Sequence, residues 1–291
     1  MTAASQFNRP TADVPESGAN AGPASQLYPN AANERVRSIW TSGDFGRIAT
    51  GYTSGAADFV ARLSLIPGEH VLDVACGTGN LALPAARAGA KVAGVDIAPN
   101  LVAQAAANAE AEELDATFQV GDAESLPYED GDFDVVMSMF GVMFAAHAPL
   151  ATSELLRVTR RGGRIALATW TASGFIGQML GIITAFVPPP ADAIPVLAWG
   201  DEKTVRERLT GVSSVHCVRR RIALEYPLTP ALTVRLFREY YGPTVRAFAT
   251  LNFDRGLLLE RALTAHWAEH NKSLDGSTRV ESEYLEVIAV R

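Results

Sequence analysis

The sequence predicts an α/β fold: a Rossmann-like, doubly wound sheet of about seven strands, the last of them antiparallel, with a helical cap. Short apolar runs alternate with segments of helical period after Pro67-Gly68, as in a parallel sheet with crossover helices. A glycine-rich turn follows the first apolar run. Right-handed crossovers place the loops after such strands at one edge of the sheet, where α/β proteins bind ligands.

The composition is that of a large globular domain with additions, since 48% of the 291 residues are hydrophobic and 20% are charged. The 32 acidic residues outnumber the 25 Lys and Arg, giving a formal net charge of -7. This balance disfavours nucleic acid and acidic membrane surfaces as partners. The two cysteines, Cys76 and Cys217, show neither a disulfide framework nor zinc-ligand spacing, so we expect a reducing, cytoplasmic location.

The N-terminal part divides into two segments. Residues 1–30 are rich in Ala, Ser, Asn, Pro and Gly and lack an apolar stretch long enough for a signal peptide, so we expect a disordered tail. Residues 31–66 form a predicted helical lead-in that packs on the core or covers a site. Its apolar positions fall on one face before and after a break at 42–44, namely Val36, Ile39, Trp40, then Phe45, Ile48 and Ala49.

Residues 67–170 form the predicted ligand-binding core of the fold. Their apolar runs predict five strands, at His70–Val74, Lys91–Asp96, Ala116–Val120, Phe133–Ser138 and Arg164–Thr169. Alanines and leucines at spacings of three and four predict the helices between them, at Asn80–Ala88, Asn100–Leu114 and Pro149–Thr159.

Residues 171–291 are predicted to supply cap helices and the closing strands of the same domain. The apolar stretch Ile176–Val187 is stopped by three prolines and is shorter than the roughly 20 residues of a membrane span. The pattern then predicts a polar helix, a strand-like run, two helical segments and a final strand, at Glu202–Leu209, Val212–Tyr226, Ala231–Leu251, Leu257–His270 and Tyr284–Val290. The last two strands complete the sheet in antiparallel fashion.

The first loop, Cys76-Gly77-Thr78-Gly79-Asn80, carries the main signal for a cofactor. Its glycines allow a sharp turn and let a ligand lie against main-chain atoms, where a Cβ would stand in the way. Asp96 ends the next strand about twenty residues on, where a carboxylate can accept hydrogen bonds from both ribose hydroxyls of an adenosine. The spacing from Gly77 to Ala82 equally satisfies the loose dinucleotide fingerprint.

Charge distinguishes the two kinds of cofactor that this loop could bind, a dinucleotide and a cationic adenosine derivative. Asp73 stands at the strand end beside the loop, where a dinucleotide would place its anionic pyrophosphate. A carboxylate there repels phosphate but suits a ligand that carries an ammonium and a sulfonium, as S-adenosylmethionine does.

The third and fourth loops complete the predicted pocket. Asp122 could accept a hydrogen bond from the adenine amino group, and Ala123 leaves room for the ring. Met139 and Phe140 offer soft and aromatic surface near the methionine and the reacting methyl.

These stretches, in their order and spacing, resemble the class I S-adenosylmethionine-dependent methyltransferases, in particular the ubiquinone/menaquinone-biosynthesis branch of the type 11 kind. The resemblance covers about Glu69 to Thr169. It departs at Arg161, where the family usually has proline, and fades after Trp170. It implies that Asp73, Ala75, Gly77 and Gly79 line the methionine side of the cofactor, with Thr78 in the same turn. It also implies that Asp96 and Ile97 hold the ribose and adenine, and that Asp122 and Ala123 meet the adenine edge.

Other candidates have plainer interpretations beside the functional one. His147 is a weak candidate for a general base, and a surface-loop histidine is the more frequent role at such a position. His266 and His270 are spaced like a metal pair on one helix face, yet no third ligand is evident, so we expect no metal. Trp40, Phe45 and the corner Tyr240-Tyr241-Gly242-Pro243 could wall a substrate pocket or pack in the core.

The sequence therefore predicts a methyltransferase that moves the methyl group of S-adenosylmethionine to a small, partly hydrophobic metabolite by in-line displacement. The acceptor atom, whether oxygen, nitrogen or carbon, stays open. We expect a small-molecule substrate and neither a nucleic-acid nor a membrane partner. The alternatives are an NAD-dependent oxidoreductase and a catalytically silent S-adenosylmethionine-binding protein.

Overall fold

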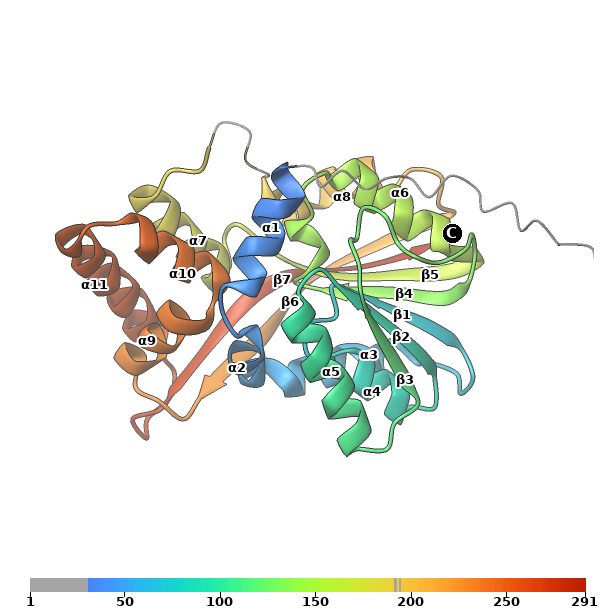
Figure 1. The fold of residues 1–291 in the computed structure, drawn as a ribbon, viewed down its shortest axis with the longest axis horizontal. Helices are drawn as coiled ribbons and strands as arrows, with labels where there is room; N and C mark the ends of the chain where they lie inside the picture. The colour runs from blue at the N-terminus through green and yellow to red at the C-terminus, as the bar shows by residue number, and fades with distance from the viewer. Residues whose placement is uncertain (1–30, 191–192, 194) are drawn as a thin grey trace, which may run out of the picture. The chain divides into compact units, whose positions relative to one another are not determined.

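The structure is a computed structural model that describes residues 31–190, 193 and 195–291, and residues 31–291 form one compact unit (Figure 1). The expectation of a disordered tail at residues 1–30 lies outside the described residues. Within the described part of the chain, none of the helices combines the length and the apolar character that a membrane span requires.

Seven strands form a single sheet in the order β3-β2-β1-β4-β5-β7-β6. The first five are parallel, and β7 pairs antiparallel with both β5 and β6. This confirms the predicted fold class and the antiparallel completion. The strands are β1 (His70–Val74), β2 (Lys91–Asp96), β3 (Ala116–Val120), β4 (Phe133–Met139), β5 (Thr159–Trp170), β6 (Ser214–Tyr226) and β7 (Thr278–Val290).

β4 ends one residue later than predicted, and β5 and β7 begin well before their predicted starts. β5 begins at Thr159 because residues 160–163 form a bulge inside the strand, where the pairing with β4 jumps from Thr159 to Arg164 and Gly162 has a φ of +74°. The final strand begins at Thr278, because its first residues pair with the last residues of β6 along the whole length of both strands.

The helices surround this sheet. Figure 1 shows α6 and α8 on one side of the sheet and α3 and α4 on the other. The helices are α1 (Ala31–Thr41), α2 (Phe45–Ala49), α3 (Thr53–Leu63), α4 (Ala82–Arg87), α5 (Pro99–Ala111), α6 (Ala148–Val158), α7 (Phe175–Phe186), α8 (Glu202–Arg208), α9 (Pro230–Tyr240), α10 (Gly242–Thr250) and α11 (Phe253–His270). Short 3₁₀ turns lie at Thr50–Tyr52, Val142–Phe144 and Val196–Gly200.

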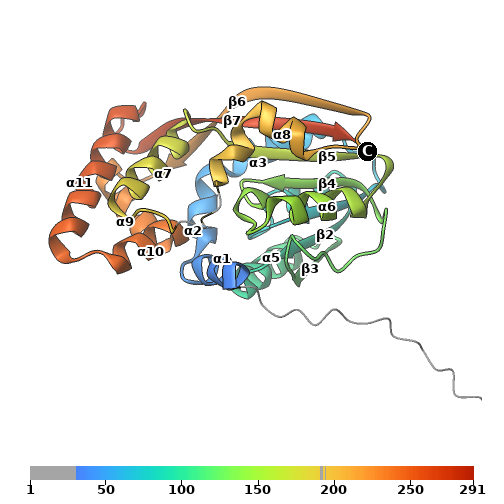
Figure 2. The ribbon, with the colours of Figure 1, turned by 90° about the horizontal axis from the view of Figure 1, so that it is seen from above.

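The cap differs from the prediction mainly over residues 231–251, and α11 begins at Phe253, four residues before the predicted Leu257. The segment predicted as one helix over 231–251 is two helices, α9 and α10, which meet at Tyr241. Pro243 stands at the start of α10, where it cannot continue the preceding helix. Figure 2, a view from above, shows α7, α9, α10 and α11 gathered at one end of the sheet, as Figure 1 does.

The lead-in is helical, as predicted, and breaks at residues 42–44. Gly43 is needed at the break because a Cβ there would lie 2.2 Å from the carbonyl oxygen of Tyr240. The same carbonyl accepts a hydrogen bond from the backbone N–H of Asp44 at 3.2 Å. The break therefore fastens the lead-in to the end of α9 and turns the chain from α1 into α2.

Candidate functional site

Three adjoining cavities lie where the loops after β1, β2, β3 and β4 meet the lead-in. The main cavity has about 640 Å³ of space, part of it open to solvent, and Asp96, Asp122 and Phe144 are among its lining residues. The turn cavity, with about 320 Å³ of space that includes open solvent, is lined by Asp73 and by Cys76, Gly77, Thr78 and Asn80 of the glycine turn. The aromatic cavity, with about 340 Å³ of space that includes open solvent, extends from Trp40 to Tyr241, and Phe45 lines all three.

The glycine turn has a backbone that few side chains tolerate. Ala75 follows β1 with a φ of +57°, and Gly77 and Gly79 have φ values of +53° and +91°. Gly77 lines both the main cavity and the turn cavity, so its backbone is open to a ligand on two sides. Gly79 lines none of the three cavities, and a Cβ on it would meet Leu83 at 3.1 Å. Gly79 thus serves the approach of α4 to the turn.

The ends of β1 and β4 approach one another closely beside this turn. A Cβ on Gly141 would lie 2.5 Å from the Cβ of Ala75. The buried Ser138 hydroxyl donates to the carbonyl of Val74 at 2.6 Å and accepts from the backbone N–H of Val142 at 3.1 Å. These contacts hold the loops after β1 and β4 together, so that Met139 and Phe140 line the main cavity with the turn.

Asp96 connects the second strand to the glycine turn. Its carboxylate accepts hydrogen bonds from the backbone N–H groups of Gly77, at 2.8 Å, and Ala98, at 2.9 Å. The side chain is buried at the wall of the main cavity, next to Ile97. Burial raises the pKa of the Asp96 carboxyl above its usual value.

Asp73 is the most enclosed of the acids, with only 1% of its surface exposed. Its carboxylate accepts a hydrogen bond from the backbone N–H of Ala82 at 3.0 Å and lines the turn cavity beside Thr78. Burial raises the pKa of Asp73 well above its usual range. A cation in the turn cavity would stabilise the ionised form.

The third loop meets the lead-in and the fourth loop through carboxylates. Asp122 accepts from the backbone N–H of Glu124 at 2.9 Å and from the Asn33 side-chain amide at 2.5 Å. Glu124 accepts from the backbone N–H of His147 at 2.6 Å and lies 2.8 Å from the ring Nδ1 of the same residue. His147 is not among the residues that line the three cavities.

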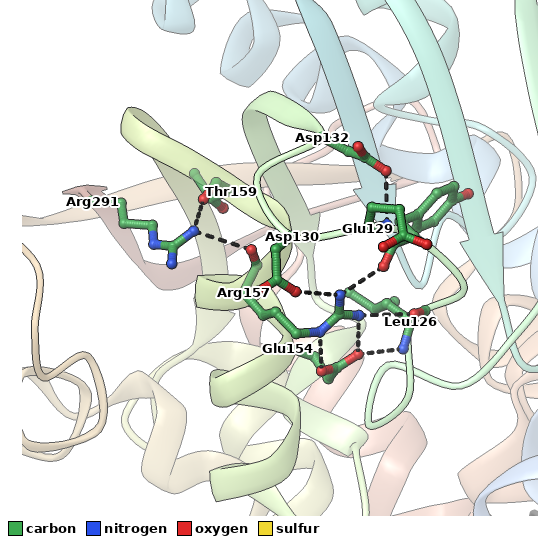
Figure 3. Close-up of polar contacts among 9 residues, drawn as sticks. Leu126, Glu129, Asp130, Asp132, Glu154, Arg157, Thr159 and Arg291 are labelled. Atoms are coloured by element: carbon green, nitrogen blue, oxygen red, sulfur yellow. Dashed lines mark hydrogen bonds and ion pairs between the residues drawn. The ribbon is translucent and has the colours of Figure 1, made fainter. Parts of the chain in front are cut away.

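A second network anchors the far end of the third loop (Figure 3). The Arg157 guanidinium donates to Glu154 at 2.7 and 2.8 Å and to the carbonyls of Leu126 and Tyr128 at 3.0 and 2.6 Å. Glu154 in turn accepts from the backbone N–H of Leu126 at 2.6 Å. These hydrogen bonds from the planar guanidinium hold the loop that carries Asp122 against α6.

The aromatic cavity is walled by rings from the lead-in, the core and the cap. Trp40 meets Phe45 and Phe144 edge-on, with ring centroids 5.3 and 4.9 Å apart. Tyr52 and Tyr241 are fully buried, and burial raises the pKa of both hydroxyls, so they are neutral at physiological pH. The rings of these residues therefore wall a cavity as well as pack in the core.

Most of the residues predicted for a cofactor line these cavities together. They are Asp73, Ala75, Gly77, Thr78, Asp96, Ile97, Asp122, Ala123, Met139 and Phe140, whereas Gly79 and His147 do not line them. The sequence patterns did not point to Asn33, Tyr52 or Arg157. Asn33 could have been found because it precedes Val36 and Trp40 by one and two helical turns, on the same face of α1.

The charged side chains that line the three cavities, among the described residues, are all acidic: Asp73, Asp96 and Asp122. A pyrophosphate would meet three carboxylates there and neither a lysine nor an arginine in the described lining. A cationic ligand fits this lining, and so does an uncharged one.

The spaced pair of histidines in α11 has structural partners. The Nε2 of His266 lies 3.0 Å from the carbonyl oxygen of Phe175, and the Nδ1 of His270 lies 2.9 Å from the carbonyl of His266. Among the described residues, no group of three or more His, Cys, Asp or Glu side chains is placed to hold a metal ion.

Comparison with known proteins gives a family match in the core. A model described as a methyltransferase domain matches residues 71–163. An uncharacterized protein of Mycobacterium tuberculosis is 37% identical over 227 residues, which cover 77% of this chain and 83% of that protein. A demethylmenaquinone methyltransferase of Beutenbergia cavernae is 40% identical over 36% of this chain and 42% of its own. A malonyl-[acyl-carrier protein] O-methyltransferase of Serratia marcescens is 34% identical over 52% of this chain and 60% of its own.

Solved structures share the fold at low sequence identity. The YcgJ protein of Bacillus subtilis aligns with a TM-score of 0.57 at 17% identity, over 82% of this chain and 98% of its own. A phosphoethanolamine N-methyltransferase of Haemonchus contortus, in complex with S-adenosylhomocysteine, aligns with a TM-score of 0.52 at 18% identity, over 82% of this chain and 52% of its own.

Proposed function

The chain belongs to the class I S-adenosylmethionine-dependent methyltransferases, and on that premise we propose that its methyl acceptor is a small, partly hydrophobic, uncharged molecule. The observation that carries the proposal is the aromatic cavity, which adjoins both cofactor cavities and whose lining residues bear no charge. Membership of this family sets aside the NAD-dependent alternative.

The residues around the main and turn cavities fit the cofactor of this family. S-adenosylmethionine supplies a methyl group on a positively charged sulfonium. In our proposal Asp96 holds the ribose, Asp122 and Ala123 meet the adenine, and the turn around Gly77 holds the methionine part with Asp73. The acidic lining favours a cationic ligand, and Gly77, which has no Cβ and lines both cavities, allows close approach of a ligand to the backbone of the turn.

The chemistry of the aromatic cavity favours an uncharged acceptor. A charged group brought into it would lose its hydration and find no opposite charge in the described lining. An apolar body gains from burial against Trp40, Phe140 and Phe237. The neutral hydroxyls of Tyr52 and Tyr241 offer hydrogen bonds that would orient a polar group on such a body.

Tyr52 stands at the junction, since it lines both the turn cavity and the aromatic cavity. We place the site of methyl transfer beside this ring. The chain contributes by holding the acceptor atom close to the methyl group and by excluding water with aromatic side chains. Because burial keeps the Tyr52 and Tyr241 hydroxyls protonated, they serve as hydrogen-bonding groups and not as phenolate bases.

The curated relatives support methyl transfer but do not identify the methyl acceptor of this protein. By their names, one acts on demethylmenaquinone and another on a malonyl group carried by a protein. The two matches span 36% and 52% of this chain. The acceptor proposed for this protein therefore rests on its own aromatic lining.

Turnover with a labelled methyl group tests the proposal. The purified full-length protein is incubated with methyl-labelled S-adenosylmethionine and a cell extract of small molecules, and the products are divided between water and an organic solvent. We expect label in neutral molecules that enter the organic phase. Label confined to phosphorylated or other charged compounds contradicts the proposed acceptor class. No labelled product from any extract, with the cofactor bound, favours the catalytically silent alternative.

A pair of tyrosine variants separates acceptor binding from cofactor binding. Tyr241 lines only the aromatic cavity, whereas its neighbour Tyr240 lines none of the three. Tyr241→Phe should raise KM for the labelled acceptor about two- to ten-fold, the effect of one neutral hydrogen bond, with unchanged affinity for S-adenosylhomocysteine. Tyr240→Phe is the control and should leave both values unchanged. A KM for Tyr241→Phe equal to that of the wild type would place the acceptor elsewhere.

A further inference from the structure

We propose that Asn33, in the first turn of α1, recognises the amino group of the cofactor's adenine together with Asp122. The inference rests on the proposed function, which places the adenine beside Asp122 and Ala123. It assigns a specificity-determining role to the lead-in, which would make α1 part of the cofactor site as well as its cover.

The hydrogen bonds of Asn33 determine which way its amide faces. The amide nitrogen donates to Asp122 Oδ2 at 2.5 Å and to Glu124 Oε2 at 3.2 Å. Both partners are carboxylate oxygens, which accept hydrogen bonds, so the nitrogen and not the oxygen of the amide must face them. The amide oxygen of Asn33 is therefore directed away from the two acids.

That oxygen is buried and has no hydrogen-bond partner among the described residues. Leaving a buried amide oxygen without a donor is costly, and proteins seldom do so without a reason. A ligand that brings an N–H group to this place would satisfy the oxygen. Asn33 is thus an acceptor that the described part of the protein leaves unused.

Asn33 lies next to the main cavity, although it is not among the residues that line it. Val36 and Trp40, one and two helical turns further along α1, line that cavity, and residues at this spacing share one face of a helix. Asp122, to which the Asn33 amide is bonded, lines the same cavity. Asn33 therefore lies on the face of α1 that carries Val36 and Trp40, and it is bonded to the acid proposed to meet the adenine.

The number of acceptors matches the chemistry of an adenine amino group. That group has two N–H bonds and needs two acceptors. Asp122 retains lone pairs beyond the two that its hydrogen bonds with Glu124 and Asn33 occupy, and the Asn33 oxygen supplies the second acceptor. A purine with an oxygen in place of the amino group would set that oxygen against two acceptors. Asn33 and Asp122 together should thus favour adenine over hypoxanthine.

Calorimetric titration with two probes tests the inference. The probes are S-adenosylhomocysteine and S-inosylhomocysteine, which differ in the amino or oxo group on the purine and in the hydrogen that the oxo form carries on the neighbouring ring nitrogen. The full-length wild type should bind the adenine probe more tightly. In Asn33→Ala we expect affinity for S-adenosylhomocysteine to fall about three- to ten-fold, the effect of one hydrogen bond, and affinity for S-inosylhomocysteine to change far less.

Two further variants make the result decisive. Glu34→Ala, at the exposed next position of α1, is the control and should bind both probes as the wild type does. Asn33→Leu keeps the size of the side chain without its amide, and it should lower the affinity for S-adenosylhomocysteine as Asn33→Ala does. Alanine is a good helix former, so Asn33→Ala should not weaken α1 itself. Circular dichroism and the unfolding temperature verify that all variants are folded.

Three outcomes would overturn the inference. An equal loss for both probes would mean that Asn33 only fastens α1 to the third loop, and no loss for either would mean that Asn33 has no role in binding. A wild type that does not bind S-adenosylhomocysteine would overturn the proposed site itself, a result distinct from the other two.

Discussion

Asp96 occupies a position where one carboxylate serves both the fold and the ligand. It accepts hydrogen bonds from the backbone N–H groups of Gly77 and Ala98, so it helps to shape the glycine turn before any ligand binds. A carboxylate has about four lone-pair directions, and those not used by the backbone are available to the ribose. The residue thus couples the shape of the turn to recognition of the cofactor.

Replacing Asp96 by Ala should weaken binding of S-adenosylhomocysteine by about 1.5 to 3 kcal/mol, the effect of one charge-assisted interaction. The physical reason is the loss of the ribose contacts, with a smaller part from loosening of the turn. Titration calorimetry on the folded variant measures the change. Unchanged affinity would count heavily against the proposed site.

Asp134 offers a matched control of the same residue type, because it lies near the start of β4, at the opposite end of the parallel strands from Asp96. Its carboxylate accepts from the backbone N–H of His70, at the start of β1, and pairs with Arg160. Asp134→Ala should reduce the stability of the sheet and leave affinity for S-adenosylhomocysteine unchanged. Equal losses of affinity in both variants would mean that general destabilisation, and not a ribose contact, explains the result for Asp96.

At the scale of elements, the position of α1 over the site depends on its close contact with the cap. A Cβ on Gly242, the first residue of α10, would lie 2.4 Å from the carbonyl oxygen of Ile39 in α1. The opposing atom belongs to the backbone, so a side-chain rotation cannot relieve the contact. The glycine allows the two helices to meet, and α1 carries Val36 and Trp40 into the wall of the main cavity.

Gly242→Ala should therefore push α1 and α10 apart. We expect the free energy of unfolding to fall by about 1 to 3 kcal/mol, the range for overpacking, together with weaker binding of S-adenosylhomocysteine. Denaturant unfolding and calorimetry measure the two effects.

Gly181, inside α7, is the matched control for this substitution. A Cβ there meets no atom within 4 Å, so Gly181→Ala should stabilise the protein by about 0.5 to 1 kcal/mol through helix propensity alone. It should leave binding unchanged. If Gly242→Ala proves as stable as the wild type, the contact between α1 and α10 is looser than the structure indicates.

At the scale of the whole molecule, the burial of acids in the site lowers the free energy of unfolding at neutral pH. Asp73 and Asp96 are buried, and burial raises the pKa of both carboxyls in the folded state. The folded protein therefore binds these protons more tightly than the unfolded chain does. The resulting stabilisation is fully present below the unfolded pKa of about 4 and is lost as the pH rises through the raised pKa of the folded state.

Asp73→Asn should remove this loss for one of the two acids, because an amide does not ionise. We expect the variant to gain stability relative to the ligand-free wild type as the pH is raised from about 4 toward neutrality. Urea unfolding at a series of pH values measures the difference. A difference that does not change with pH would contradict burial of an ionisable Asp73.

Local pattern alone predicted most of the sheet. The first three strands have the predicted bounds. For β1 and β2 the reason is that a buried parallel strand reads as a short apolar run whose ends are marked by turn residues, whereas β3 is a more exposed strand at the edge of the sheet. The break between α9 and α10 was not predicted, although Gly242 and Pro243 are visible in the sequence. The reason is that Gly242 is required by a contact with Ile39, which is distant in the chain.

The sequence by itself determined the fold class and the acids around the glycine turn, because both depend on residues adjacent in the chain or at corresponding strand ends. Only the tertiary structure decided what covers the site. It placed Asn33 beside Asp122 and Tyr52 between two cavities, and it left His147 outside all three. Those outcomes depend on contacts between residues far apart in the sequence, which periodicity and spacing do not encode.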